Sequence, residues 1–322
     1  MVTTQEATGV RDRMCAVFSE ANGEDPCGSA PLWEHCLIVE IPTPWEHEVM
    51  DSPAFPVGLA DVFEQRPDVR LQVIQPDDAY LVDGHSRVML FSRPAGPVRE
   101  MARREYLVPS DRLLEVVTTV LGGGSGVLAD WEQHNDGIRD LLVCTHGSRD
   151  ICCASIGQPT YMELHSRYSN SHTRVWRLSH TGGHRLAPNV IDMPSGRYWS
   201  RLTPSRAKQV AAHSGDVAEL YDSYRGWPAI ASPGAQMAER EAFMREGWDW
   251  IGRRVESEVL ETSEDGLEEQ VALRSMESDV VVTSYRAVVR QSGVVQSIEC
   301  LSDTLAKDYP QYELVSFEAV GP

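Results

Sequence analysis

The sequence has no long hydrophobic run and comparatively few basic residues. Nothing in its 322 residues approaches the roughly 20 consecutive apolar residues that cross a bilayer. Its start, MVTTQEATGVRDRMCAVFSE, lacks the basic and then apolar pattern of a cleaved leader. Lys and Arg number 29 against 48 Asp and Glu, and the formal charge of -19 repels the phosphates of nucleic acids and anionic lipids. We therefore expect a cytoplasmic protein that binds neither nucleic acid nor membranes and whose partner protein carries a basic patch.

The cysteines lack the pattern of a disulfide framework. There are seven, an odd number, and no two have the Cys-x-x-Cys spacing of a thiol oxidoreductase. In a reducing compartment most free cysteines are small buried apolar residues. We interpret Cys15, Cys36 and Cys300 in this way.

What is present is typical of a globular protein of two or three domains. Hydrophobic residues make up 42% and charged residues 24% of the chain. Apolar patterns predict one order of elements twice: strand, helix, three strands, helix. In the first copy the strands begin near residues 36, 69, 87 and 104, and the helices cover residues 59–65 and 112–121, after an initial helix over residues 8–21. In the second copy the strands begin near residues 141, 174, 189 and 197, and the helices cover residues 158–168 and 203–213.

This order, a βαβ unit followed by a hairpin and a final helix, is thioredoxin-like. The predicted fold class is therefore α/β, with two tandem thioredoxin-like units followed by an α+β extension. We expect a first unit over residues 1–125 that is degenerate and carries no ligands, a second unit over residues 138–215, and the extension over residues 216–322. The Gly-rich residues 121–137 are the predicted linker. In the extension we expect a helix over residues 236–255 and strands over residues 270–276, 280–290 and 313–320.

Cysteine and histidine gather in the second unit. Eight residues separate Cys144 from Cys153, and three separate His180 from His184. Two thiolates and two imidazoles suit zinc, iron or a two-iron cluster. Cys152 competes with Cys153, because the two are adjacent and composition does not distinguish them.

The spacing leaves the chemistry open. The glycines in HTGGH, residues 180–184, favour a loop over a helix, and such a loop can fold closely around an inorganic centre. A zinc site, an iron-sulfur cluster, a thiol centre, and simple core packing with surface histidines all remain compatible with the pattern.

The surrounding residues narrow the alternatives. The stretch LLVCTHGSRDICCASIGQPTYMEL, followed by VWRLSHTGGHRLAPNVIDMPSGRYWSRLTP, resembles the sucrase/ferredoxin-like family. The resemblance extends to DPCGSAPLWEHCLIVEIPTPW near the start and to YRGW and QMAEREAFMREGWDW near the end. It therefore covers nearly the whole chain. The stretch also resembles thioredoxin-like ferredoxins, with histidines in place of their second cysteine pair.

The resemblance implies a 2Fe-2S cluster with bis-histidinyl ligation, held by Cys144, Cys153, His180 and His184. Replacing two anionic thiolates by neutral imidazoles raises the reduction potential. Because the non-ligating imidazole nitrogen can exchange a proton, we also expect the midpoint potential to fall as the pH rises.

Further polar residues lie beside the expected ligands. We interpret them either as braces of the loops or as groups that tune the cluster or contact a partner. They are His146, Arg149, Asp150, Cys152 and Arg185.

These observations predict an iron-sulfur electron carrier rather than a catalyst. The alternatives are a redox enzyme that uses the cluster beside a substrate site, and a zinc or thiol oxidoreductase. Despite the family name, the sequence contains no carboxylate pair whose spacing indicates a glycosidase.

Overall fold

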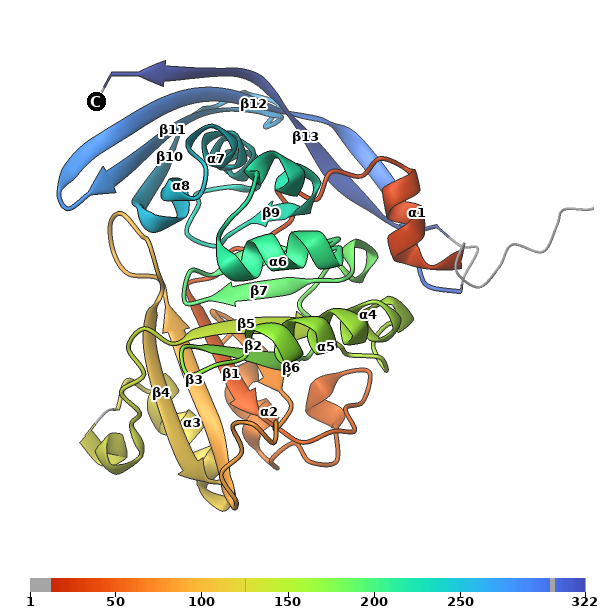
Figure 1. Cartoon of the computed structure of the whole chain (residues 1–322), viewed down its shortest axis with the longest axis vertical. Helices are drawn as coiled ribbons and strands as arrows, with labels where there is room; N and C mark the ends of the chain where they lie inside the picture. Colours follow the sequence, from red (N-terminus) through yellow and green to blue (C-terminus); the bar gives the residue numbers. More distant parts are fainter. Residues whose placement is uncertain (1–12, 125, 302–304, 322) are drawn as a thin grey trace, which may run out of the picture.

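A large mixed sheet runs through most of the chain. The computed structural model describes residues 13–124, 126–301 and 305–321. In these residues nine strands form one sheet in the order β4-β3-β1-β2-β6-β5-β7-β8-β9 (Figure 1). A second sheet has the order β10-β11-β12-β13. The chain is thus a mixed α/β protein, as the sequence predicts.

The two halves of the large sheet repeat one order of elements. The first half contains β1 (His35–Glu40), α2 (Leu59–Glu64), β2 (Val69–Ile74), β3 (His85–Ser92), β4 (Ala102–Pro109) and α3 (Leu113–Leu121). The second contains β5 (Arg139–Cys144), α4 (Ile151–Ser155), α5 (Gly157–Tyr168), β6 (Thr173–Leu178), β7 (Val190–Met193), β8 (Arg197–Trp199) and α6 (Pro204–Ala212). In each half the first two strands are parallel, and the third pairs antiparallel with the first. This repetition matches the predicted order, while the thioredoxin-like assignment of each half stays a prediction.

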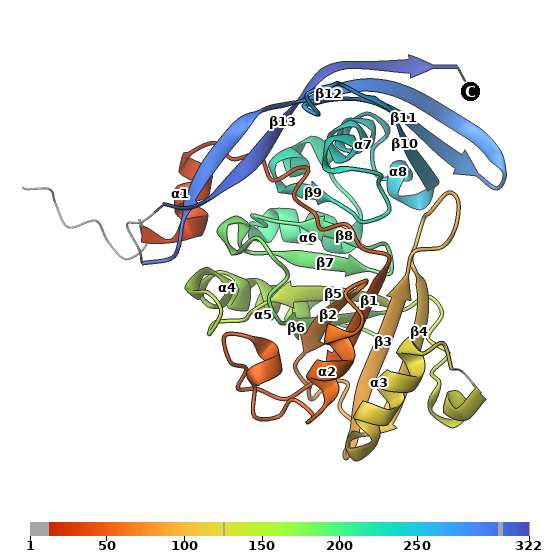
Figure 2. The same cartoon turned by 180° about the vertical axis from the view of Figure 1, so that it is seen from behind.

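The halves meet where β2 lies beside β6. Ile74 pairs with Leu178, and the Ser179 amide donates to the Val73 carbonyl at 2.8 Å. In Figures 1 and 2, α4, α5 and α6 cover one face of the sheet and α2 and α3 cover the other. None of the helices in the described ranges has the length and apolar character needed to cross a bilayer.

Both faces of β1 are buried, which explains its uninterrupted apolar run. Leu37 and Val39 pack in the core under α2 and α3, whereas Cys36 and Ile38 pack in the core on the opposite face. Successive strand residues point to opposite faces, so a strand covered on both sides needs apolar residues throughout. The interpretation of Cys36 as a buried apolar residue is confirmed.

A buried ionic network also connects the halves. Glu105 on β4 accepts hydrogen bonds from Arg87 on β3 and from Arg103, and Arg174 on β6 reaches it at 2.9 Å. Arg174 also donates to Asp140 on β5 at 2.7 Å. Because each buried carboxylate has several guanidinium partners, the network compensates much of its desolvation cost.

The extension contains the predicted helix and antiparallel sheet. β9 (Tyr224–Gly226) joins the large sheet beside β8. Helices α7 (Pro233–Glu246) and α8 (Asp249–Gly252) follow, and α7 packs against the second sheet. That sheet comprises β10 (Arg254–Thr262), β11 (Glu268–Glu277), β12 (Val280–Ile298) and β13 (Leu305–Val320). The first helix, α1 (Cys15–Ala21), contacts β12 and lies beside the ends of β12 and β13 (Figures 1 and 2).

Several predicted boundaries differ from the structure. The helix expected over residues 236–255 ends at Glu246, because Gly247 has a positive φ of 69°, which favours glycine and does not continue a helix. The chain then forms α8 and β10, which the sequence did not predict as separate elements. The expected flexible linker is partly ordered, since residues 126–131 form a 3-10 helix and Leu128 is fully buried. Of the helix expected over residues 8–21, residues 8–12 lie outside the described residues, and α1 begins at Cys15.

Candidate metal centre

Three of the four predicted ligands lie together at one edge of the large sheet. Cys144 is the last residue of β5 and pairs in register with Leu178 of the parallel strand β6, so the loops after both strands start side by side. His180 lies in the second loop, and Cys153 lies on α4. One ligand atom from each of Cys144, Cys153 and His180 fits within a group whose members are all within 4.8 Å of one another. The two cysteines are each 1% exposed.

Helix α4 directs the side chains of the two adjacent cysteines toward different neighbours. The Asp150 side chain caps α4 by accepting from the Cys152 amide at 2.8 Å. Because consecutive helical residues are rotated by about 100°, the two sulfur atoms point in different directions. Cys153 Sγ lies 3.9 Å from His180 Nδ1, whereas Cys152 Sγ lies 3.1 Å from Cys300 Sγ. The geometry therefore groups Cys153, and not Cys152, with Cys144.

His184 lies next to this group without being part of its compact core. Its ring centroid is 5.7 Å from that of His180. Its Nδ1 lies 2.9 Å from Asp150 Oδ2 and 3.1 Å from Cys15 Sγ. With Nδ1 directed at the Asp150 carboxylate, Nε2 is the nitrogen left for a metal, which is the usual arrangement of a ligating histidine.

Hydrogen bonds to backbone carbonyls hold the loop that carries both histidines. Gly182 and Gly183 have φ values of 84° and 79°, so the prediction of a loop is confirmed. Arg225 donates to the Gly182 carbonyl at 3.0 Å and to Asn189 Oδ1 at 2.9 Å, and Asn189 donates to the Gly183 carbonyl at 2.8 Å. A Cβ on Gly183 would lie 3.0 Å from the Arg225 guanidinium. Arg225 is not among the residues predicted for the site, although it belongs to the stretch YRGW.

His146 braces both loops. Its Nε2 lies 2.8 Å from the Glu46 carbonyl and must donate to it, so Nδ1 is unprotonated and accepts from the His180 amide at 3.2 Å. Burial lowers the pKa of His146, which is consistent with a neutral ring. His146 therefore fixes the backbone of His180 against the first half of the sheet.

Two of the residues predicted beside the ligands form ion pairs with distant segments and do not contact the sulfur atoms. Arg149 pairs with Glu48 and lies 3.1 Å from His47 Nδ1. Arg185 donates to Glu24 at 2.7 Å and lies over the ring of Tyr309. Both arginines therefore attach more distant segments to the loops of the candidate site.

The first group favours one thiolate even without a metal. Hydrogen bonds from Cys153 and His180 hold the pKa of Cys144 well below its usual range, although burial opposes this effect. The proton shared within the pair correspondingly raises the pKa of Cys153. Cys144 is thus prepared to act as an anionic ligand.

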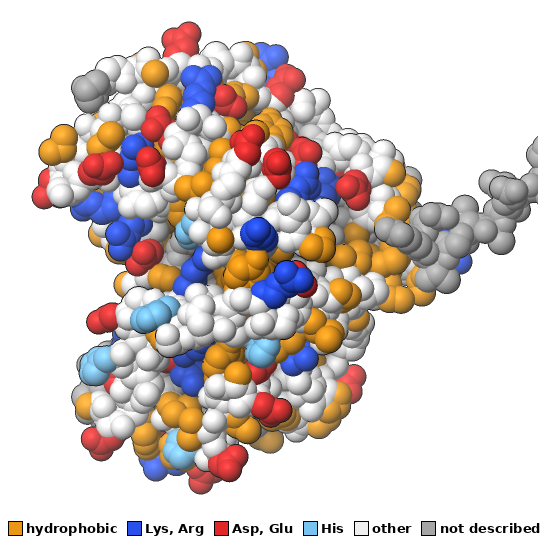
Figure 3. Space-filling view, in the orientation of Figure 1, with side chains coloured by type: hydrophobic (Ala, Val, Ile, Leu, Met, Phe, Trp, Pro, Cys, Tyr) orange, Lys and Arg blue, Asp and Glu red, His pale blue; other side chains and the backbone are white. Residues whose placement is uncertain are grey.

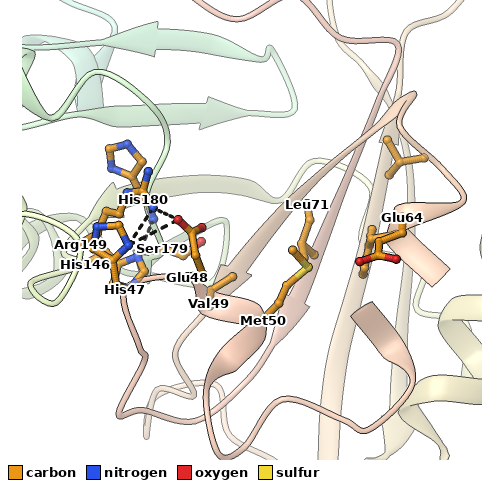
Figure 4. A pocket seen from close by; sticks show the side chains of 12 residues that line it. His47, Glu48, Val49, Met50, Glu64, Leu71, His146, Arg149, Ser179 and His180 are labelled. Carbon is orange, nitrogen blue, oxygen red and sulfur yellow. Dashed lines mark hydrogen bonds and ion pairs between the residues drawn. The ribbon is translucent and has the colours of Figure 1, made fainter. Parts of the chain in front are cut away.

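A cleft of about 370 Å³ opens beside His180. Figure 4 shows His180, Ser179 and His146 at one end of it, and Met50, Leu71 and Glu64 toward the other. Both polar and apolar side chains line it, so it can receive a small molecule or a segment of a partner.

The interpretation of Cys15 as a buried apolar residue is confirmed, whereas that of Cys300 is wrong because its side chain is only partly buried. Their sulfur atoms meet that of Cys152, at 3.5 Å from Cys15 and 3.1 Å from Cys300. No local pattern in the sequence indicates this group, because its members lie far apart along the chain.

Together, the mixed sheet and the thiol and imidazole groups at the ends of β5 and β6 define a class of protein with a candidate metal centre on an α/β scaffold. Comparison of the sequence with known families shows that residues 26–226 match the sucrase/ferredoxin-like family, and the chain belongs to that family. It is also 28% identical over 195 residues to "Altered inheritance of mitochondria protein 32" of Meyerozyma guilliermondii. That match covers 55% of this chain and 67% of the relative. No solved structure matches the chain.

Proposed function

We propose that the chain is an iron-sulfur electron-transfer protein whose 2Fe-2S cluster is held by Cys144, Cys153, His180 and His184. The observation that carries the proposal is the gathering of two thiols and one imidazole from β5, α4 and the loop after β6, with a second imidazole beside them. When bound, such a cluster accepts and releases one electron at a time.

The residues present suit this group chemically. Two cysteines and two histidines are a known donor set for a 2Fe-2S centre. Cys144 favours the anionic form that a metal requires. Asp150 holds His184 through Nδ1, which orients the ring and increases the basicity of its other nitrogen.

The position of His184 favours a cluster over a single zinc ion. A tetrahedral zinc ion with nitrogen and sulfur ligands places its ligand atoms about 3.3–3.8 Å apart, so all four must converge on one point. Cys144, Cys153 and His180 offer ligand atoms within 4.8 Å of one another, whereas His184 lies outside this group with Nδ1 bonded to Asp150. A cluster distributes its ligands over two metal atoms and therefore accommodates a wider set.

Positive charge surrounds the loop that carries the histidines. Arg225 donates to the Gly182 carbonyl, Arg70 donates to the Thr181 carbonyl, and Arg185 follows His184 directly. Burial and the neighbouring Arg185 lower the pKa of Arg225 to about 9, so it stays charged at neutral pH. Nearby cations stabilise a centre that gains an electron, which adds to the effect of the imidazole ligands in raising the potential.

The exposure of the ligands indicates where an electron would pass. The sulfur atoms of Cys144 and Cys153 are buried, while the His184 side chain is 24% exposed. The histidine side is therefore the proposed face for a redox partner. Because the chain carries a charge of -19, we propose that this partner presents a basic patch.

The remaining expectations belong to the same proposal. We propose that each half of the large sheet is a thioredoxin-like unit, the first without ligands, with boundaries at residues 1–125 and 138–215, followed by the extension over residues 216–322. We also propose that the protein acts in the cytoplasm.

The cleft beside His180 favours a second candidate function, a redox enzyme that uses the cluster next to a substrate site. Turnover of a small molecule, abolished when Met50→Trp fills the cleft but with the cluster spectrum intact, would support this candidate. Unchanged electron transfer to an external acceptor in the same variant would support the carrier.

The proposed cluster is tested by anaerobic purification of the chain and measurement of iron, acid-labile sulfide and visible absorption. We expect equal amounts of iron and sulfide and a brown protein. Cys144→Ser and His180→Ala should bleach it, whereas His172→Ala, which removes an exposed histidine, should not. A colourless chain containing zinc in place of iron would overturn the proposal.

A further inference from the structure

Three thiols that come from distant parts of the chain meet beside the proposed cluster. The Sγ atoms of Cys15 and Cys152 are 3.5 Å apart, those of Cys152 and Cys300 are 3.1 Å apart, and those of Cys15 and Cys300 are 3.3 Å apart. A carboxylate joins them, since Asp150 Oδ1 lies 3.3 Å from Cys300 Sγ and 3.8 Å from Cys15 Sγ. These four residues offer one ligand atom each within 4.8 Å of one another.

The segments that carry these thiols are fastened to each other. The Leu301 amide donates to the Arg13 carbonyl at 2.9 Å, and the Cys15 amide donates to Cys300 Sγ at 3.2 Å. Helix α1 also contacts the 3-10 turn of residues 184–186, which follows the histidine loop. The convergence of the three sulfur atoms is therefore built into the backbone.

The surroundings are those of a protected thiolate site. Met14, Ala16, Ala187 and Ile298 are buried around the sulfur atoms, and Cys300 remains partly exposed. An apolar shell keeps water from the metal-sulfur bonds, and the exposed edge gives an ion a way in.

The distances fit an ion better than a disulfide. A disulfide requires a sulfur separation of about 2.05 Å between two partners and leaves a third thiol without one. Two thiolates on a tetrahedral zinc ion are about 3.8 Å apart, so the three sulfur atoms need to separate by less than about 0.7 Å.

We propose that Cys15, Cys152, Cys300 and Asp150 form a second metal site, which takes one zinc ion. Binding replaces the thiol protons by bonds from the three sulfur atoms to Zn²⁺, and the protons pass to solvent. Thiolate ligands favour zinc over magnesium or calcium, and a carboxylate oxygen is an accepted fourth zinc ligand.

The second site joins residues that lie outside the family match to residues that lie inside it. Cys15 and Cys300 lie outside residues 26–226, whereas Cys152 lies inside them and next to Cys153. Asp150 contacts both the second site, at Cys300, and His184. The zinc ion thus fixes α1 and the segment after β12 against the helix that carries a proposed cluster ligand.

The direct test measures iron and zinc by elemental analysis in the full chain, purified anaerobically after growth with both metals. We expect one zinc ion per chain in the wild type and in Cys144→Ser/Cys153→Ser, which should lose iron. Cys15→Ser/Cys300→Ser should bind zinc with an affinity roughly tenfold lower or more, but it should keep its iron. Cys36→Ser, at a buried cysteine away from both groups, should retain both metals.

The results separate this proposal from the proposed function. Iron without zinc in the wild type overturns the second site and leaves the proposed cluster intact. Zinc without iron overturns the cluster, and it supports the second site if Cys15→Ser/Cys300→Ser loses that zinc. Loss of the zinc in Cys144→Ser/Cys153→Ser and in no other variant also overturns the second site, because the ion would then be bound by Cys144 and Cys153.

A measurement on the unmodified chain removes any dependence on folded variants. We expect Zn²⁺ added to the reduced, zinc-depleted chain to slow iodoacetamide labelling of the partly exposed Cys300, as mapped by mass spectrometry, and to leave the labelling of Cys27 unchanged. Unchanged labelling of Cys300, or a Cys15–Cys300 disulfide in the anaerobically purified chain, contradicts the proposal.

Discussion

Cys152 and Cys153 are neighbours on α4, yet their sulfur atoms belong to different groups. Cys153 Sγ faces His180 Nδ1 at 3.9 Å, and Cys152 Sγ faces Cys300 Sγ at 3.1 Å. The rotation of about 100° between consecutive helical residues lets one short helix serve both groups. The pair of cysteines that looks redundant in the sequence therefore has two separate roles in the proposed account.

The two cysteines should differ when each is replaced. We expect Cys153→Ser to lose most of the iron and visible absorption, because it removes a proposed cluster ligand. Cys152→Ser should keep the iron but lose zinc. The measurement is metal content and absorbance per chain after anaerobic purification, with Cys36→Ser as the control. Loss of iron in Cys152→Ser with full retention in Cys153→Ser would reverse the assignment of the ligand.

Gly183→Ala should perturb the candidate site as well as stability. The left-handed φ of 79° costs an alanine about 1 kcal/mol, and its Cβ would lie 3.0 Å from the Arg225 guanidinium. Gly84→Ala is the matched control, because Gly84 has φ 71° and nothing within 4 Å of the added Cβ. Both variants should lower the free energy of unfolding, measured with urea.

Cluster content separates the two glycine variants. Only Gly183→Ala should lower iron content or shift the visible spectrum, since only its Cβ meets the arginine that holds the histidine loop. If Gly84→Ala and Gly183→Ala have equal iron content and identical spectra, the loop does not depend on this close approach.

The sequence contained enough information for the order of the elements but not for the second group of thiols. Strand and helix patterns are local, so β1, β2, β5 and β6 were predicted close to their observed starts. Contacts between residues such as Cys15 and Cys300 depend on how β12 and β13 extend beyond β10 and β11, which no local periodicity encodes. The same holds for Arg225, which donates to the carbonyl of Gly182 more than forty positions away.

The predicted ends of elements were wrong where the conformation of one residue interrupts a periodic pattern. The apolar stripe that predicted a helix to residue 255 continues past Gly247, but the positive φ of that glycine ends α7. Leu128 shows the reverse case, because a Gly-rich stretch that predicts a flexible linker contains a side chain that the core buries.

Glu105 should give the protein a stability that depends on pH. Burial alone would raise its pKa, but Arg174, Arg103 and Arg87 lower the pKa of Glu105 to about 2. A carboxyl whose folded pKa lies below its unfolded value of about 4.3 stabilises the fold above that value, and this contribution is lost as the pH falls toward 2. Its size is roughly 3 kcal/mol at neutral pH.

Glu105→Gln tests this contribution. We expect a lower free energy of unfolding at pH 7, and a difference from the wild type that shrinks as the pH is lowered from 5 toward 3. The control is Asp68→Asn, at an exposed ion pair with Arg66, which should have little effect because solvent screens it. A pH-independent difference would show that Glu105 acts by packing alone.

Electron transfer to a basic partner should depend on ionic strength. Acidic and basic side chains are interspersed on the face shown in Figure 3, but the total charge of -19 attracts a cationic protein at a distance. We expect the rate of reduction of a basic cytochrome to fall as salt rises from 0.01 to 0.5 M, because the Debye length shortens from about 30 Å to less than 10 Å. A small neutral acceptor should show no such fall. Equal salt dependence for both acceptors would argue against a partner with a basic patch.

The central claim is that two histidines and two cysteines hold a 2Fe-2S cluster. Its most direct test is electron-nuclear double resonance of the dithionite-reduced chain, in which imidazole nitrogens bound to iron give strong couplings. We predict couplings from two nitrogens in the wild type and in His172→Ala, and the loss of one of them, or of the whole signal, in His180→Ala and in His184→Ala. A reduced cluster signal without nitrogen couplings, or full colour in the double variant His180→Ala/His184→Ala, would contradict the account.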